Sequence, residues 1–299
     1  MAAPLELEDS LLWKLPQLGI HRVALEHHPE APEKRQLLAW LPAIDWPADQ
    51  RSELERALAP LAEPFGLTLP PISWSRQEEE DWSLSWKQHW QPDPIGQRFL
   101  ALPAWLECPP DYADRLVLTI DPGSAFGTGS HPTTRLCLEA LEVEAERHGG
   151  SLAGLRAADL GCGSGILGLG ALRLGAASLM AVDSDPLAVR ATAHNASLNG
   201  YELENVGPIR LDLGSAERLA ELLEGQPADL LLCNILAPVI EALCPTFSAL
   251  LAPDGVGLLS GLLVDQAEGL QQVLAAEGWQ ADLAAEQGRW GLLVLHKAR

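Results

Sequence analysis

The chain has 299 residues, of which 47% are apolar, enough to build one large domain and a second, smaller one. Its 20 basic and 41 acidic side chains give a formal charge of −21, which argues against a protein that binds nucleic acid through clustered lysine and arginine. No apolar run approaches the roughly 20 residues that span a bilayer, and the acidic N-terminus lacks a secretory pattern, so we expect a cytoplasmic protein without membrane contact.

The five cysteines are spread along the chain without a C-x-x-C pair. This spacing is typical of a reducing compartment and indicates neither a disulfide framework nor a zinc site. We therefore predict that the protein holds no metal ion.

The first 105 residues hold eight of the ten tryptophans, whereas the glycine-rich loops and the long aliphatic runs come later. This shift in composition predicts two domains, of which the first, a small α+β unit, occupies residues 1–72. Residues 21–27 and 34–42 are typical of strands, and residues 48–66 place leucines on one stripe of a helix.

Residues 73–100 are predicted to link the two domains, because prolines stand at both ends of the Trp-rich segment that they contain. Trp82, Trp86 and Trp90 are spaced four apart, which puts three rings on one helix face. Such a stripe usually packs against a domain, and a hinge helix or a surface for substrate is the alternative.

Residues 101–299 form the predicted second domain, in which strand and helix patterns alternate from about residue 115. The alternation predicts an α/β, Rossmann-like, doubly wound parallel sheet with an antiparallel edge at the C-terminus. The expected strands are residues 115–121, 155–161, 178–183, 228–236 and 255–263, the expected helices are residues 132–150, 164–175, 185–200 and 265–278, and a hairpin is expected over 278–297.

The segment AFGTGSHPTT, the first glycine loop, spans residues 125–134 and leads into a predicted helix. It lacks the Gly-Lys-Ser/Thr of a P-loop, and His131 has no second ligand at metal spacing, so packing within the loop is the simpler role for this histidine. The hydroxyls of Thr133 and Thr134 either cap the helix or hold the polar end of a ligand. Phe126 would cover that ligand if the loop closed over it.

The segment DLGCGSG, the second glycine loop, spans residues 159–165 at the end of a predicted strand. Gly161 and Gly163 let a ligand approach the backbone, and the helix that follows offers unpaired N–H groups. Asp183 ends the next strand 22 residues after Gly161, a spacing at which a carboxylate binds two ribose hydroxyls. These features predict a nucleoside site; a tight turn between strand and helix is the plainer explanation of the glycines alone.

The identity of the nucleoside depends on the third glycine. In the dinucleotide pattern G-x-G-x-x-G it would stand where this chain has Ile166, but here it comes one position earlier, at Gly165. The pattern D-x-G-x-G-x-G instead resembles the first motif of S-adenosylmethionine-dependent methyltransferases. An NAD-dependent dehydrogenase is the alternative.

Asn234 ends the apolar run LLLCN and is expected beside the same crevice. It is either a simple strand end or a side chain whose carbonyl accepts a hydrogen bond from a substrate amine and aims its lone pair at a methyl group. Amino-group methyltransferases commonly carry Pro-Pro-aromatic after this residue, whereas this chain has Ile-Leu-Ala. The difference favours a flexible alkyl amine over a planar base or amide.

Several stretches together closely resemble the PrmA family, the methyltransferases of the eleventh protein of the large ribosomal subunit. They are DPGSAFGTGSHPTTRLCLEAL, DLGCGSGIL, AVDSDPLAV, the Asn-Gly pair at 199 and 200, and NILAPVI, and the resemblance covers residues 115–265. It implies a ferredoxin-like N-terminal recognition domain, a swinging linker and a seven-stranded catalytic domain that trimethylates lysine and N-terminal amines. It also implies that Thr134, Gly161, Asp183 and Asn234 contact S-adenosylmethionine.

The candidate catalytic residue is therefore Asn234. The candidate cofactor-binding residues are Thr134, Gly161, Gly163, Asp183, Asn234, Phe126 and His131. A monomer that acts on a basic ribosomal protein, without direct contact to nucleic acid, fits the acidic charge, although acidic surfaces also serve solubility alone. The alternatives are a methyltransferase of RNA bases or glutamine side chains and a protein that binds S-adenosylmethionine as a sensor.

Overall fold

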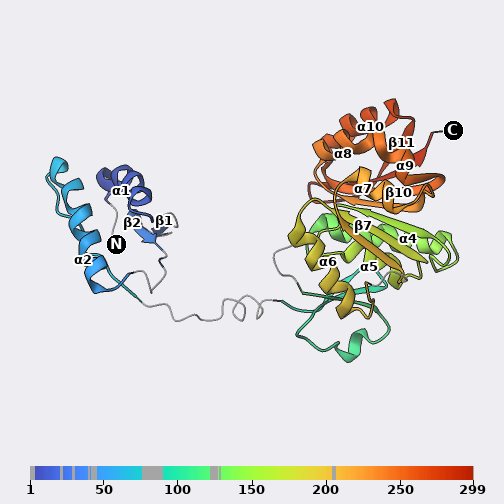
Figure 1. Ribbon diagram of the computed structural model, residues 1–299, viewed down its shortest axis with the longest axis horizontal. Helices are drawn as coiled ribbons and strands as arrows, with labels where there is room; N and C mark the ends of the chain where they lie inside the picture. The colour runs from blue at the N-terminus through green and yellow to red at the C-terminus, as the bar shows by residue number, and fades with distance from the viewer. Residues whose placement is uncertain are drawn as a thin grey trace. The chain divides into compact units, whose positions relative to one another are not determined.

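The computed structural model describes residues 4–20, 23–28, 31–39, 41, 46–75, 90–121, 127, 129–203 and 207–298. The chain divides into two compact units, Met1–Ser85 and Trp86–Arg299 (Figure 1). Phe126, Trp82 and Trp86 lie outside the described residues, so the predicted tryptophan stripe and the predicted boundaries at 72 and 100 stay predictions.

The N-terminal unit packs helices against an antiparallel pair of strands. Its elements are α1 (Leu5–Gln17), β1 (Val23–His28), β2 (Ala31–Ala39), α2 (Ala48–Leu58) and two 3-10 turns (Ala59–Leu61 and Glu63–Phe65). The predicted strands form, and the predicted helix over residues 48–66 forms as α2 up to Leu58, where 3-10 turns follow; α1 was not predicted. Leu7, Leu11 and Leu15, spaced four apart on α1, are buried with Leu54 and Leu58 of α2. The complete ferredoxin-like arrangement stays a prediction.

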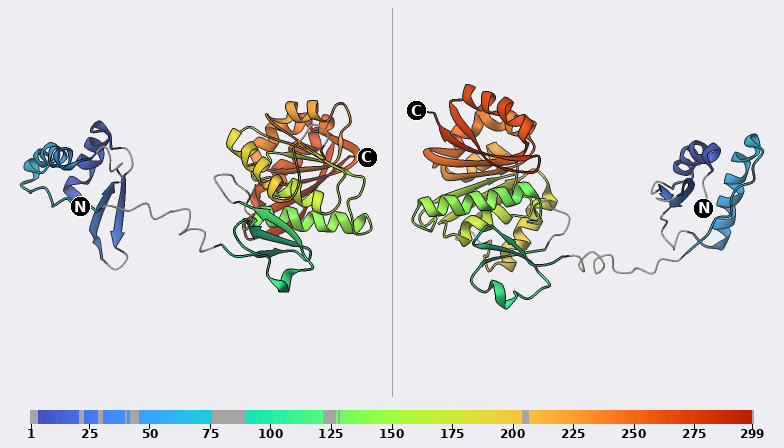
Figure 2. Two further views of the ribbon diagram at one scale, coloured as in Figure 1. Left: turned by 60° about the horizontal axis from the view of Figure 1, so that its bottom comes forward. Right: turned by 180° about the vertical axis from the view of Figure 1, so that it is seen from behind.

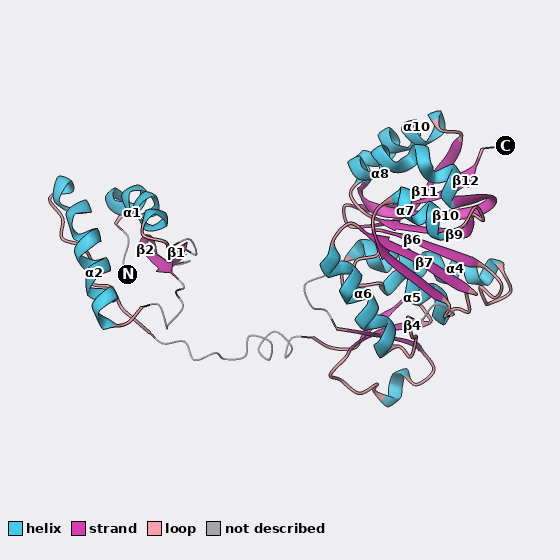
Figure 3. Cartoon of the chain, in the orientation of Figure 1, coloured by secondary structure: helices cyan, strands magenta, loops and turns pink. Residues whose placement is uncertain are grey.

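The second unit is built on a seven-stranded sheet, as predicted (Figure 3). The strand order is β11-β12-β10-β9-β6-β7-β8, in which β12 runs antiparallel to both of its neighbours and the other adjacent pairs are parallel. The strands are β6 (Arg156–Leu160), β7 (Ser178–Asp183), β8 (Ile209–Leu213), β9 (Ala228–Asn234), β10 (Leu251–Leu263), β11 (Trp279–Gln287) and β12 (Trp290–Lys297). β8 was not predicted.

Helices cover both faces of this sheet (Figure 2). Along β9, Leu230 and Leu232 are buried against one helix layer, and Leu231 and Cys233 against the other, since successive strand residues point to opposite faces. One layer contains α4 (Pro132–Arg147), α5 (Ile166–Arg173) and α6 (Pro186–Leu198), and the other contains α7 (Ala216–Leu222), α8 (Ala237–Leu243), α9 (Phe247–Leu250) and α10 (Ala267–Ala276). The four predicted helices are α4, α5, α6 and α10.

A separate three-stranded sheet precedes the first glycine loop. It contains β3 (Asp93–Ile95), β4 (Phe99–Pro103) and β5 (Leu116–Ile120). The predicted strand at 115–121 therefore forms, but it pairs with β4 and does not join the seven-stranded sheet. Buried apolar side chains of this small sheet, Ile95, Phe99, Leu118 and Ile120, belong to the same core cluster as α4 and α5.

Glu142 fastens this small sheet to α4. Its side chain is 7% exposed, and its two carboxylate oxygens accept hydrogen bonds from the backbone N–H groups of Gln97 (2.8 Å), Arg98 (2.8 Å) and Phe99 (3.2 Å). Hydrogen bonds to a charged group are stronger than those between neutral groups. The turn between β3 and β4 is thus held by one buried carboxylate.

We expect Glu142→Ala to lower the free energy of unfolding by about 3 kcal/mol, because it leaves three backbone donors without their acceptor. Chemical denaturation followed by circular dichroism would measure the loss. Glu139→Ala, one turn earlier on the same helix and less buried, is the control and should change stability by less than about 0.5 kcal/mol. Equal effects of the two substitutions would contradict the assigned role.

Candidate functional site

Gly161, Asp183 and Asn234 lie at the carboxyl ends of three adjacent strands. β6 lies between β7 and β9, and the order of the strands along the chain reverses at this point. Ligands of doubly wound sheets bind in the crevice outside such a switch point. The second glycine loop follows β6, Asp183 ends β7, and Asn234 ends β9.

The glycines of the second glycine loop have left-handed backbone conformations. Gly161 has φ of 78° and Gly165 has φ of 81°. A Cβ atom on Gly161 would stand 2.5 Å from Cγ2 of Ile235, and one on Gly165 would stand 2.8 Å from Cγ2 of Thr192. Larger residues are therefore excluded by both backbone conformation and space.

Asp183 is fixed by backbone N–H groups on either side. Its Oδ2 accepts from the N–H of Gly163 at 2.9 Å, and its Oδ1 accepts from the N–H of Asp185 at 3.0 Å. The side chain remains partly exposed, and each carboxylate oxygen has a further lone pair. The carboxylate can therefore bind two hydroxyl groups of a ligand while it positions the second glycine loop.

Asn234 and Thr134 come together from β9 and the first turn of α4. The Nδ2 of Asn234 donates to Oγ1 of Thr134 at 3.5 Å, and Thr134 is fully buried. Among the described residues, Oδ1 of Asn234 is buried and has no hydrogen-bond partner. An acceptor that is buried without a partner costs about 1 to 3 kcal/mol, so this oxygen is suited to a donor supplied by a ligand.

His131 caps α4, and neither threonine hydroxyl does. Its Nδ1 accepts from the backbone N–H of Thr133 at 3.3 Å and lies 2.8 Å from the Thr133 hydroxyl oxygen, whereas the Thr134 hydroxyl faces Asn234. The imidazole also packs edge-on against Trp290, with ring centroids 4.9 Å apart. His131 thus lies beside the crevice without a set of metal ligands around it in the described part of the chain.

A buried amide joins the second glycine loop to Asp121, which directly follows β5, and sequence reasoning missed it. Asn195 on α6 accepts from the N–H of Asp121 at 2.9 Å and donates to the carbonyl of Ser164 at 2.8 Å. The Ser164 hydroxyl in turn donates to the carbonyl of Gly127 in the first glycine loop. An asparagine inside a helix is unusual, which is the sequence signal that could have pointed to it.

Asn199, one turn further along α6, holds β5 in the same way. Its side chain accepts from the N–H of Thr119 at 3.0 Å and donates to the carbonyl of the same residue at 2.7 Å. This is the asparagine of the Asn-Gly pair noted in the sequence. Both asparagines are buried, so α6 carries the strand that precedes the first glycine loop.

Asp159, the first residue of the second glycine loop, is buried beneath it. Burial raises the pKa of this carboxyl to about 7, although the N–H of Gly168 donates to Oδ2 at 3.1 Å and opposes the shift. Burial also raises the pKa of the thiols of Cys137, Cys162 and Cys233. These thiols therefore stay protonated and are not nucleophiles.

Because the pKa of Asp159 is raised, we expect Asp159→Asn to reduce the change of the free energy of unfolding with pH. The unfolded carboxyl ionises near pH 4 and the folded one near pH 7, so the wild-type free energy of unfolding falls as pH rises between these values. Between pH 5 and pH 8 the free energy of unfolding of the variant should rise by about 2 to 3 kcal/mol relative to that of wild type. Denaturant midpoints across this range would measure it, with the exposed Asp254→Asn as a control that should follow wild type.

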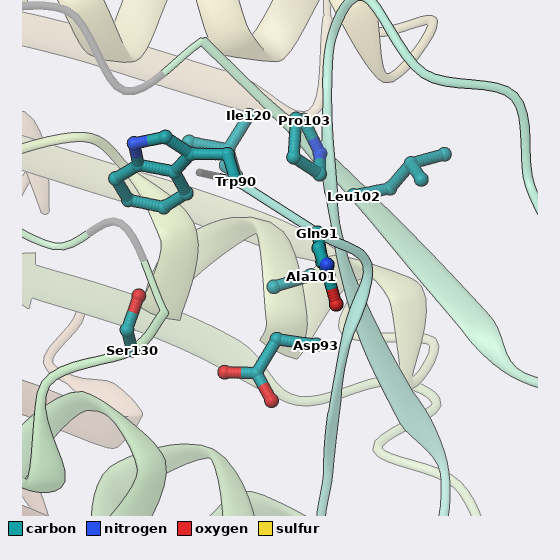
Figure 4. A pocket seen from close by; sticks show the side chains of 8 residues that line it. All are labelled: Trp90, Gln91, Asp93, Ala101, Leu102, Pro103, Ile120 and Ser130. Atoms are coloured by element: carbon teal, nitrogen blue, oxygen red, sulfur yellow. The ribbon is translucent and has the colours of Figure 1, made fainter. Parts of the chain in front are cut away.

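A small recess lies beside the end of the first glycine loop (Figure 4). Asp93 contributes its carboxylate, but both oxygens already accept from Nη1 of Arg135, at 2.8 and 2.9 Å. Those predicted site residues that the structure describes do not line this recess. Its lining residues are Trp90, Gln91, Asp93, Ala101, Leu102, Pro103, Ile120 and Ser130.

In the described part of the chain, every helix is too short or too polar to cross a membrane.

Comparison with known proteins gives consistent matches. The profile of the family described as "Ribosomal protein L11 methyltransferase (PrmA)" matches residues 20–298. The protein named ribosomal protein L11 methyltransferase in Synechococcus sp. (strain RCC307) is 61% identical over 295 residues, which cover 99% of this chain and 95% of the relative. The protein of the same name in Parasynechococcus marenigrum (strain WH8102) is 60% identical over 297 residues, which cover 99% of this chain and 100% of the relative. Similarity therefore extends well beyond residues 115–265.

Solved structures give the same result for the fold. The structure of a ribosomal protein L11 methylase from Lactobacillus delbrueckii subsp. bulgaricus is 31% identical and matches with a TM-score of 0.59, over 70% of this chain and 100% of its own. The predicted class I methyltransferase fold is confirmed.

Proposed function

Since the chain belongs to the ribosomal protein L11 methyltransferase (PrmA) family, we propose that it trimethylates lysine side-chain and N-terminal amines of ribosomal protein L11. Its cofactor is S-adenosylmethionine, and membership of this family removes the dehydrogenase and sensor alternatives. The observation that carries the proposal is the buried Oδ1 of Asn234, which has no partner among the described residues and lies beside the second glycine loop.

The residues of the crevice fit this cofactor. The backbone of Gly161 and Gly163 accommodates close contact, Asp183 would accept hydrogen bonds from both ribose hydroxyls, and the N-terminus of α5 favours a carboxylate. When bound, S-adenosylmethionine supplies a methyl group activated by a sulfonium centre. We assign Thr134, Gly161, Gly163, Asp183 and Asn234 to its binding, and we keep His131 and Phe126 as predicted contacts, Phe126 lying outside the described residues.

Asn234 orients the amine that attacks the methyl group. Because its Nδ2 is engaged by Thr134, Oδ1 is the atom of the amide left to accept an N–H of the substrate and to direct the nitrogen lone pair. A lysine amine has a pKa near 10.4, so its deprotonation costs about 4 to 5 kcal/mol at pH 7. Desolvation in the crevice lowers this cost. We assign the proton to water, before or during binding.

The formal charge of −21 supports a basic partner, because long-range attraction speeds the association of oppositely charged proteins. We propose that the enzyme acts as a monomer in the cytoplasm and makes no direct contact with nucleic acid.

Intact-mass spectrometry of unmethylated L11, incubated with the enzyme and S-adenosylmethionine, tests the proposal. Mass should rise in steps of one methyl group, and fragmentation should locate the added groups on lysine and N-terminal amines. No rise in mass, while S-adenosylmethionine still raises the melting temperature of the enzyme, would leave the cofactor assignment in place and remove L11 as substrate.

A further inference from the structure

Trp290 is the first residue of β12. This strand begins at the end of the sheet where β9 ends with Asn234. In the register of the sheet, Asn234 on β9 pairs with Ser260 on β10. The hydroxyl of Ser260 donates to the carbonyl of Gly291 on β12 at 2.8 Å. Trp290 directly precedes Gly291, so hydrogen-bonded neighbours connect it to the end of β9.

A second set of contacts leads from Asn234 to the same ring. Asn234 donates to Thr134 in the first turn of α4, and His131 caps that turn. The imidazole of His131 meets the indole of Trp290 at an interplanar angle of 68°, with centroids 4.9 Å apart. Trp290 is half-buried against the core cluster that contains α4. Two independent routes thus connect the ring of Trp290 to the amide of Asn234, one through Ser260 and Gly291 and the other through Thr134 and His131.

We propose that Trp290, oriented by His131, is the wall of the amine site and determines how far methylation proceeds. This inference rests on the proposed function, since it concerns the same amine. The ring would contact the methyl groups already carried by the nitrogen, and Asn234 would contact the N–H groups that remain.

Successive methyl transfers depend to different degrees on the contact of the amine with Trp290 and on its contact with Asn234. In each transfer the nitrogen lone pair forms a bond to the methyl carbon, the C–S bond breaks, and its electron pair stays on sulfur. The ammonium product loses a proton to water before the next transfer. The neutral amine has two N–H groups before the first transfer, one before the second and none before the third.

Asn234 therefore has no hydrogen bond to accept from the amine in the third transfer. At that stage the nitrogen carries two methyl groups, and the product is a quaternary cation. Aromatic faces attract such cations and pack well against their methyl groups. The third transfer thus depends more on Trp290 than the first transfer does, and less on Asn234.

The test compares Trp290→Leu and Trp290→Phe with wild type, using intact-mass time courses of L11 methylation. We expect Trp290→Leu to lower the ratio of trimethylated to dimethylated amine about tenfold and to slow the third transfer more than the first. Trp290→Phe, which keeps an aromatic face, should retain most of the wild-type ratio. Trp105→Leu, a half-buried tryptophan of the same unit that follows β4, should leave the ratio unchanged.

Melting temperature and affinity for S-adenosylmethionine show whether each variant is folded, and Trp290→Met replaces the leucine variant if that variant is not. An unchanged ratio, or an equal slowing of all three transfers, would overturn the role of Trp290 and leave the proposed function intact. A wild-type enzyme that adds no methyl group to L11 would overturn both.

Discussion

Asn234→Ala is expected to lower kcat for the first methyl transfer to L11 about 100- to 1,000-fold, the usual cost of removing a group that positions the reacting atoms. The substitution removes Oδ1, which is buried without a partner among the described residues and which we assign to the substrate amine. Affinity for S-adenosylmethionine should change by less than about tenfold, because the second glycine loop and Asp183 remain. Single-turnover kinetics and calorimetric titration would measure the two quantities separately.

Thr134→Val is the matched control for this prediction. It keeps the shape of the side chain but removes the hydroxyl that engages Nδ2 of Asn234, so the amide loses part of its orientation. We expect kcat to fall about tenfold, since the contact is a single neutral hydrogen bond. If Asn234→Ala lowered the affinity for S-adenosylmethionine as much as it lowers kcat, the role of Asn234 would be cofactor binding alone.

Asp183→Ala should raise the Kd for S-adenosylmethionine about 100-fold, the effect of losing two hydrogen bonds to a charged acceptor. The substitution also frees the N–H of Gly163, which loosens the second glycine loop. Isothermal titration of the folded protein would measure the affinity directly, without any need for the protein substrate.

Asp185→Ala provides the comparison for Asp183, because it removes a carboxylate only two residues away. Asp185 caps α6 by accepting from the N–H of Leu187 at 2.8 Å. Its loss should lower the free energy of unfolding by about 1 kcal/mol and leave the Kd within about threefold. If both variants weakened binding equally, general electrostatics and not contact with the ribose would explain the effect of Asp183.

The local pattern of the sequence was sufficient to predict most elements of the second unit, Trp86–Arg299. The strand and helix that flank each glycine loop are adjacent in sequence, and parallel strands place their carboxyl ends at one edge. For this reason the sequence was sufficient to predict that Gly161, Asp183 and Asn234 lie beside one crevice. The helix predicted over residues 185–200 follows from the same short-range rules, and in the structure Asp185 is the N-cap of α6.

What the sequence did not predict depends on distant partners. The run at β5 has the same apolar character as the strands of the large sheet, so its pairing with β4 could not be predicted from periodicity. Glu142 binds backbone groups more than 40 positions away, and Asn195 reaches Asp121 across 74. The role of Thr134 was left open between capping and binding because both are short-range possibilities for a threonine in a first turn.

The amide of Asn195 has a consequence for how this enzyme can change over time. One buried side chain serves the backbone of Asp121 on one side and that of Ser164 on the other. Substitutions that shift either segment alter the geometry available to the other, so their effects on stability will not add. The segment that directly follows β5 and the second glycine loop are therefore expected to vary together among descendants of this sequence, as a single inherited unit.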